Sequence, residues 1–319
     1  MLTVNFDVSP RLLELASRVT VQPGGLSAVT AGETYEDDNA SSVTRLLGSV
    51  LYQTMHNGRD KPLDFAMRSF REVGFERRLL ERTPELTREI SAPLLEPVGG
   101  TSAVALDGLR VRLPEGASID ATAARFPVPC VRPGLSPGFL YMTAPQTLGL
   151  GGTTLRVYAH LDEPDRAPEL WATAIETLQQ LGIHWHAKIL SNRALYPRND
   201  ALVIYLQRDG WPHARRLAES LQATGVLAPG VSPFTRAITS SVGCAFEPTD
   251  QRGPHRGASF GQHRANVLAQ ALVSHATLPD PDTTPVAESI YAAFLDADID
   301  PVEPARNLSS PAIDVLGIY

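Results

Sequence analysis

Lysine is almost absent from this chain, and one of its two lysines lies beside a pair of histidines. The lysines are Lys61 and Lys188, so every other strong cation is an arginine. Arginine keeps its proton in proteins, whereas a lysine placed among other cations can lose its proton and act as a base. Lys188 is therefore a candidate base, and the alternative is a surface lysine without a chemical role.

Two predicted strands, residues 155–161 and 183–190, each divide into an apolar and a polar face, because side chains alternate along a strand. The polar faces carry Arg156, Tyr158 and His160 in the first strand, and His184, His186 and Lys188 in the second. If the strands pair, these groups converge on one surface of the sheet. The alternative is an ordinary sheet with its polar side chains in solvent.

Further arginines follow these strands. Arg198 lies in the turn after the Lys188 strand, Arg236 follows a Pro-Phe-Thr segment, and Arg264 opens a predicted helix. Several guanidinium groups near one lysine could bind a phosphate dianion through forked hydrogen bonds. A helix start at Arg264 would add the positive end of the helix dipole.

The first third of the chain is predicted to be mainly helical. Apolar stripes at helical spacing indicate helices over residues 12–16 and 43–51. Residues 24–39 are rich in glycine, threonine and acids and predict a loop. Residues 64–89 are amphipathic and carry both signs of charge, which is typical of a solvated outer helix.

After residue 97 the pattern changes to short strands and turns. Asp107-Gly108 separates two strand-like runs, 102–106 and 109–113, and is a strong hairpin signal. A strand, helix, strand, strand and helix then follow at 155–161, 167–181, 183–190, 201–206 and 212–223. This order predicts an α+β fold with a mixed or antiparallel sheet, in which residues 98–319 form the α+β part after a helical region at 1–97.

Composition excludes several classes of protein. The formal net charge of -7 argues against a general nucleic-acid binder. The first residues lack the pattern of a secretory signal, and the uncharged run 133–155 contains prolines and five glycines, so a membrane helix is not expected. Cys130 and Cys244 are too few for a disulfide framework, which favours a cytoplasmic location.

Several short segments together resemble the HopA-type effector family, which includes the lyase subunit of class V lanthipeptide synthetases and of thioamitide pathways. The resemblance covers roughly residues 97–276. The segments are SPGF at 136–139, RVYAHL at 156–161, KILSNRALYPRNDALVIYL at 188–206, PFTRAI at 233–238 and SFGQHR at 259–264.

The resemblance implies a phosphothreonine or phosphoserine lyase that acts on a ribosomal precursor peptide after a separate kinase has phosphorylated it. Elimination of phosphate would leave dehydrobutyrine or dehydroalanine. More distant phosphothreonine lyases use a lysine base and a histidine acid, and His160 and Lys188 follow in a similar order here. Those effectors carry a lysine where this chain has Tyr158.

The same mechanism can be argued from the residues. The α-proton of a peptide residue is hard to remove, so a neutral base such as Lys188 must be held against it. His160 could donate a proton to the departing oxygen, and Tyr158 or Tyr205 could supply a hydroxyl donor. The phosphate would be held by Arg156, Arg198, Arg236 and Arg264. No metal or organic cofactor is expected.

Other functions remain as alternatives. His184 and His186 could contribute to a zinc site, but a third ligand at short spacing is missing. A binding module without catalysis could hold a leader peptide or the kinase on an exposed strand edge. An effector acting on a host protein is the remaining alternative. No membrane or nucleic-acid partner is expected.

Overall fold

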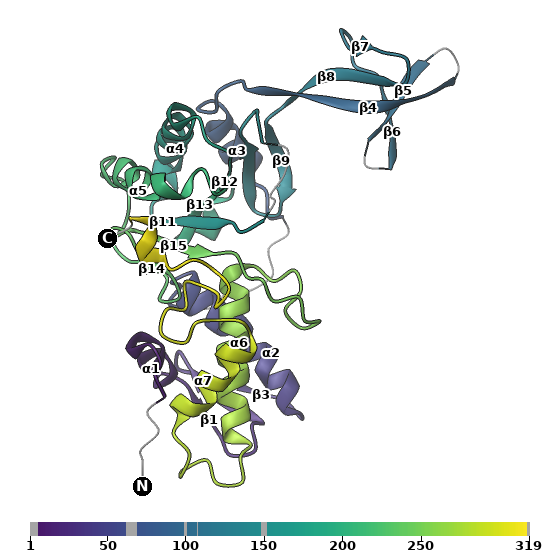
Figure 1. Cartoon of the computed structure of the whole chain (residues 1–319). Coiled ribbons are helices and arrows are strands. Elements are labelled where there is room, and N and C mark those ends of the chain that lie inside the picture. Colours follow the sequence, from purple (N-terminus) through teal and green to yellow (C-terminus); the bar gives the residue numbers. More distant parts are fainter. Residues whose placement is uncertain (1–5, 62–68, 99–100, 107, 148–151, 318–319) are drawn as a thin grey trace.

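A computed structural model describes residues 6–61, 69–98, 101–106, 108–147 and 152–317 of the chain. These residues form a helical body, a seven-stranded sheet covered by helices, and a long two-stranded arm that ends in a small sheet (Figure 1). One hydrophobic core joins the helical body to the seven-stranded sheet, and the arm has a small core of its own. The predicted α+β fold is confirmed.

The seven-stranded sheet is antiparallel throughout and has the order β14-β15-β11-β13-β12-β10-β9. Its strands are β9 (Val131–Ser136), β10 (Phe139–Thr143), β11 (Leu155–Leu161), β12 (Trp185–Leu190), β13 (Arg198–Leu206), β14 (Arg236–Ala237) and β15 (Val242–Phe246). Every residue of β13 is buried, as expected for a strand with a neighbour on each side. The strand predicted at 201–206 begins three residues earlier in the structure, at Arg198. Arg198 thus belongs to the sheet and not to the preceding turn.

Helices cover the apolar face of this sheet. They are α3 (Val73–Leu80), α4 (Ala167–Leu181) and α5 (Ala214–Gln222) (Figure 1). The buried stripe of α4 faces β12, whose side chains Trp185, Ala187 and Ile189 are all buried. Gly182 ends α4 in the left-handed conformation, with φ of 65°, which glycine adopts without strain. The two helices predicted at 167–181 and 212–223 are confirmed, and the polar face of the sheet points the other way, toward the helical body.

The helical body combines both ends of the chain. It contains α1 (Pro10–Ala16), α2 (Ala40–Leu51), the π-helix η1 (Tyr52–His56), α6 (Phe260–Ala276) and α7 (Val286–Asp296). The helix α2 packs along α6, and α7 packs on the same helix (Figure 1). The two predicted N-terminal helices are confirmed. The apolar face of α2 is buried against the C-terminal helix α6, a pairing that short-range periodicity does not encode.

A small sheet of β1 (Thr20–Val21), β2 (Ser27–Thr30) and β3 (Glu33–Glu36) also belongs to this body. The prediction of a loop over residues 24–39 was therefore wrong for β2 and β3. Ala28 and Thr30 alternate as buried residues with partly exposed neighbours, which is the period of a strand. The abundant polar residues of this stretch hid that alternation.

The arm is a five-stranded sheet of order β6-β5-β4-β8-β7. Its strands are β4 (Thr87–Val98), β5 (Thr101–Leu106), β6 (Leu109–Arg112), β7 (Ser118–Ile119) and β8 (Ala123–Pro129). Leu106 pairs with Leu109, which confirms the hairpin predicted at Asp107-Gly108, although Asp107 itself lies outside the described residues. The predicted change of organisation at residue 97 falls at the end of β4.

The amphipathic stretch 64–89 differs from its prediction as one outer helix. Residues 62–68 lie outside the described residues, α3 covers only Val73–Leu80, and β4 has begun by Thr87. The pairing of β4 with β8 decides the end of this stretch, because a strand partner outweighs local helix propensity. Within the described residues, no helix is both long and apolar enough to cross a membrane.

Gly261 is the point where α6 meets η1. A side chain on Gly261 would overlap the imidazole of His56, which is buried between the two helices. We expect Gly261→Ala to destabilise the protein by about 1–3 kcal/mol, the usual cost of overpacking a core. Gly74→Ala on α3 is the matched control, because its new methyl group meets nothing within 4 Å. Urea denaturation measures both, and an equal effect of the two changes would contradict this packing argument.

Candidate functional site

The register of the sheet brings the two predicted polar faces onto one side. Lys188 lies opposite Val203, which lies opposite Tyr158 on β11. Two residues away on each strand, Tyr205 lies between its partners His186 and Arg156 in the same way. The strands β11 and β12 do not pair directly, because β13 separates them. The convergence therefore depends on β13 and includes one of its side chains, Tyr205.

Lys188 lines a cavity of about 830 Å³, called here the Lys188 cavity, between the sheet and the start of α6. From the sheet and η1, its wall includes Phe139, Arg156, Lys188, Tyr205 and Tyr52. The Lys188 ammonium nitrogen lies 4.3 Å from the ring centre of Phe139 and 5.8 Å from that of Tyr205. Within the described residues no carboxylate forms an ion pair with Lys188. Its amine is thus held by aromatic rings and left available to a ligand.

Arg156 is the second cation of the cavity, and it is already paired. Its guanidinium forms two hydrogen bonds with the Glu247 carboxylate and lies 4.9 Å from the ring centre of Tyr205. Burial opposes the charge of Arg156, but the neighbouring Tyr158, Tyr205 and Glu247 outweigh burial and raise its pKa. Arg156 therefore stays charged in a buried position on the cavity wall.

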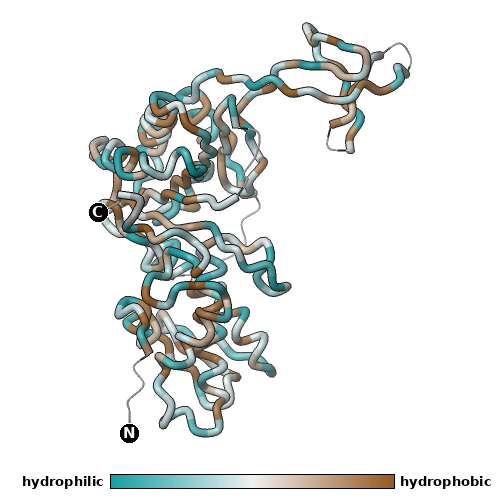
Figure 2. The backbone as a smooth tube through the Cα atoms, viewed as in Figure 1, coloured by the Kyte–Doolittle hydropathy of each residue, from teal (hydrophilic) through white to brown (hydrophobic). Residues whose placement is uncertain are grey.

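The segment between β15 and α6, residues 247–259, closes the other side of the Lys188 cavity. This hydrophilic segment (Figure 2) and the first turn of α6 contribute Glu247, Asp250, His255, Arg256, Ser259 and Gln262, among others. Ser259 and Gln262 form a capping box at the start of α6, in which each side chain bonds the backbone of the other. The N-terminal end of this 17-residue helix therefore opens into the cavity, where its dipole favours an anion. Arg256, exposed beside it, adds a positive charge.

Arg198, predicted to bind phosphate, is paired with a carboxylate and does not line the Lys188 cavity. It makes two hydrogen bonds of 2.6 Å to Asp200 and one of 3.1 Å each to Tyr52 and Asn57. Burial would raise the pKa of Asp200, but Arg198 lowers it to about 2. Burial lowers the pKa of His56, next to this pair, to about 4, so His56 is neutral near pH 7. This cluster ties β13 to the helical body.

His160 and Tyr158, the other predicted catalytic residues, do not line the Lys188 cavity. The β11 ladder shifts register between Ala159 and Leu161, and the His160 ring turns to the carbonyl of Pro229, 3.0 Å away. Tyr158 is buried between His56 and Phe260, and this burial raises its pKa well above the usual value. The structure therefore brings Lys188, Arg156 and Tyr205 together and leaves His160 and Tyr158 outside.

Arg236 and Arg264 also have other partners. Arg236 lies on the edge strand β14 and binds Glu303 and Asp314. Arg264 is fully buried in α6 and binds Pro304, Asn307 and other groups of the C-terminal segment, which it holds against the helix. Burial lowers the pKa of Arg264 to about 9. Phosphate binding by Arg198, Arg236 and Arg264 stays a prediction from the sequence.

One cluster among the described residues has the composition of a metal site: Asp250, His255 and His263, whose ligand atoms lie within 4.8 Å of one another. Its hydrogen bonds argue against a metal. Arg264 donates to Nδ1 of His263 at 2.7 Å, so the proton of this imidazole is on Nε2, which donates to Asp250 at 3.2 Å. Arg252 takes the remaining acceptor capacity of Asp250. The two histidines considered as zinc ligands have other partners, since His184 bonds Asp209 and His186 bonds Tyr141.

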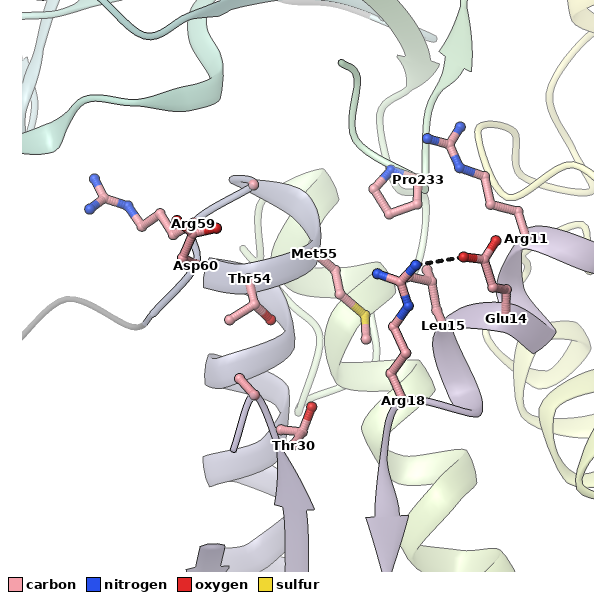
Figure 3. A pocket seen from close by; sticks show the side chains of 12 residues that line it. Arg11, Glu14, Leu15, Arg18, Thr30, Thr54, Met55, Arg59, Asp60 and Pro233 are labelled. Atoms are coloured by element: carbon pink, nitrogen blue, oxygen red, sulfur yellow. Dashed lines mark hydrogen bonds and ion pairs between the residues drawn. The ribbon is translucent and has the colours of Figure 1, made fainter. Parts of the chain in front are cut away.

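A second cavity of about 600 Å³ lies between α1 and η1 (Figure 3). Arg18 reaches into it and is paired with Glu14, while Met55 and Leu15 supply apolar surface (Figure 3). Arg11 and Arg59 are directed to backbone carbonyls of Val231 and Leu195. None of the predicted site residues lines this cavity.

The sequence predictions omitted the residues that 247–259 supplies. Glu247, His255 and Arg256 lie in a stretch without periodicity, so no pattern placed them near Lys188. The one available signal was the capping box from Ser259 to Gln262, which predicts a helix start and an anion-favouring end.

The fold and the Lys188 cavity define an α+β protein with an anion-favouring site between a sheet and a helix start. The chain belongs to the HopA1 effector protein family, which matches residues 130–306, more than half of the chain. The matched residues contain β9 to β15 and α6, and therefore most of the cavity wall.

Two solved structures are similar to this chain. The effector protein from Pseudomonas syringae pv. tomato strain DC3000 aligns over 93% of this chain and 96% of its own at 11% identity, with a TM-score of 0.49. The effector protein from Pseudomonas syringae pv. syringae strain 61 aligns over 81% and 88%, respectively, at 14% identity, with a TM-score of 0.45. No curated protein matches the chain.

The buried pair of Arg198 and Asp200 generates a prediction on stability. Asp200→Asn leaves Arg198 buried without its counter-charge, so we expect a loss of about 3–5 kcal/mol at pH 7. Because the folded pKa of Asp200 is about 2 and the unfolded value is about 3.9, its contribution is complete above pH 4 and is lost as the pH falls through 2. Urea denaturation should therefore show that the difference in free energy of unfolding between wild type and variant becomes smaller below pH 4.

The control for this prediction is Glu219→Gln, which disrupts the exposed Arg215–Glu219 pair on α5. An exposed pair contributes about 0–1 kcal/mol, so this variant should stay close to wild type. If Asp200→Asn lowered the free energy of unfolding at pH 7 as little as the control does, a structural role for the buried pair would be contradicted.

Proposed function

We propose that the protein is a phosphothreonine or phosphoserine lyase. It removes the α-proton of a phosphorylated residue in a ribosomal precursor peptide and releases phosphate, which leaves dehydrobutyrine or dehydroalanine. A separate kinase supplies the phosphorylated peptide. The observation that carries the proposal is Lys188, an amine without a carboxylate partner among the described residues, in a cavity that favours an anion.

Electrostatics supports a phosphorylated ligand in the Lys188 cavity. Arg256 and Lys188 are cations without carboxylate partners among the described residues. Arg156 is a paired cation, and burial opposes its charge while Tyr158, Tyr205 and Glu247 maintain it. The start of α6 adds the positive end of its dipole. A phosphate dianion satisfies these groups together, whereas a neutral ligand would leave them unsatisfied.

Elimination also needs a base close to the phosphate, because the α-proton is one carbon away from the carbon that bears the leaving oxygen. Lys188 and the cationic groups share one cavity, which satisfies this requirement. The pair of electrons from the broken C–H bond forms the new double bond, and the C–O bond breaks toward phosphate. The reaction consumes no nucleotide and no redox cofactor.

The family gives a second candidate substrate for the same chemistry. Because the chain belongs to an effector family, a phosphorylated host protein is the alternative to a precursor peptide. Assaying both substrates at equal concentration separates the two, since the preferred one should have the higher kcat/KM.

Lys188→Arg tests the base. Arginine keeps the positive charge and most of the bulk but does not become neutral near pH 7. The variant should still bind phosphopeptide and should lose elimination by about 100-fold or more, the range expected for a general base. The assay is mass spectrometry of a phosphorylated precursor peptide, in which each elimination removes one phosphoric acid.

Wild-type turnover should require neither ATP nor a divalent metal once the peptide is phosphorylated. Unphosphorylated peptide should stay unchanged. A Lys188→Arg variant with a near-normal rate, or loss of wild-type activity in EDTA, would contradict the proposed mechanism. A protein that binds the peptide tightly and never eliminates phosphate would instead be the adaptor considered from the sequence.

Arg256→Ala tests the phosphate subsite. Because a charge-assisted hydrogen bond contributes about 1.5–3 kcal/mol, the variant should bind phosphopeptide roughly 10-fold or more weakly. Binding of the unphosphorylated peptide should change little. Arg216→Ala on α5 is the matched control, since Arg216 is exposed and does not line the Lys188 cavity. Calorimetry measures both peptides, and equal losses for the two would place Arg256 outside the subsite.

A further inference from the structure

Among the described residues, His255 is the one histidine that lines the Lys188 cavity. It lies on the segment between β15 and α6 and is 7% exposed. Its Nδ1 atom is buried and has no hydrogen-bond partner within the described residues. A buried ring nitrogen without a hydrogen-bond partner costs free energy unless a ligand forms a hydrogen bond with it.

The His255 ring is positioned by a chain of fixed groups. It meets the ring of His263 edge to face, with ring centres 5.1 Å apart. His263 is in turn held by Arg264 on one nitrogen and by Asp250 on the other. Arg252 fixes Asp250 from the far side. These contacts restrain the imidazole of His255 at the cavity wall.

We propose that His255 is the general acid that protonates the departing phosphate oxygen, an inference that rests on the proposed lyase function. Lys188 takes the α-proton and becomes an ammonium ion. The electrons of the C–H bond form the double bond while the C–O bond breaks. The released oxygen takes the proton of the His255 imidazolium, so hydrogen phosphate leaves and His255 becomes neutral.

Other donors fit this role less well. His160, predicted for it from the sequence, turns toward Pro229 outside the cavity. Tyr52 accepts a hydrogen bond from Arg198, and burial raises the pKa of Tyr52, so its hydroxyl is a poor acid. The arginines of the cavity keep their protons. Burial lowers the pKa of His255, and a bound phosphate dianion would oppose this shift and favour the imidazolium form that the step requires.

The test compares two leaving groups. Sulfate, the anion of a strong acid, leaves without a proton, whereas phosphate needs one. Peptides with O-phosphothreonine and O-sulfothreonine at the same position therefore separate an acid from a base. We expect His255→Asn to lose elimination of phosphate by about 100-fold and to keep most of its elimination of sulfate. Lys188→Arg should lose both reactions.

His275→Asn, at the other end of α6, is the matched control and should eliminate phosphate at the wild-type rate. Equal losses of His255→Asn on both esters would overturn the inference, because a merely structural role does not distinguish leaving groups. It would also be overturned if His255→Asn were fully active and His160→Asn showed the selective loss; the lyase function would then stand. A wild-type protein that eliminates neither ester would refute the lyase function and, with it, the role of His255.

Discussion

The antiparallel pairing of β13 with both β11 and β12 is the constraint on which the rest of the structure depends. This strand is buried at every residue, so its register cannot slip without moving apolar side chains to the wrong face. The register sets Tyr205 between Arg156 and His186, and Val203 between Tyr158 and Lys188. The positions of the charged groups in the Lys188 cavity follow from this pairing.

The start of β13 also joins the two parts of the core. Arg198 and Asp200 form a buried ion pair that reaches Tyr52 and Asn57, in and just after η1. A buried pair contributes little net stability, but either partner alone is strongly unfavourable. The pair therefore fixes how the helical body sits on the sheet.

Burial decides which cations near the site are paired within the protein and which are left available to a ligand. Two buried arginines that the sequence grouped as phosphate ligands hold the fold, Arg198 through a carboxylate and Arg264 through carbonyls. The half-exposed Arg236 also pairs with carboxylates. Lys188 and Arg256, which line the cavity, have no carboxylate partner among the described residues and keep capacity for a ligand. The physical reason is that a buried guanidinium must be satisfied inside the protein, whereas a group at a cavity wall can be satisfied by what binds there.

The sequence by itself determined the elements and faces that short-range order controls: the hairpin at Asp107-Gly108, the helix 167–181, and the alternation that puts Lys188 and Arg156 on polar strand faces. It also grouped segments typical of the family. Only the tertiary structure decided that β13 lies between β11 and β12, that α2 packs on α6, and that residues 247–259 supply His255 and Arg256 to the cavity. These are contacts between distant segments, which depend on which apolar faces meet, and local periodicity carries no information about that choice.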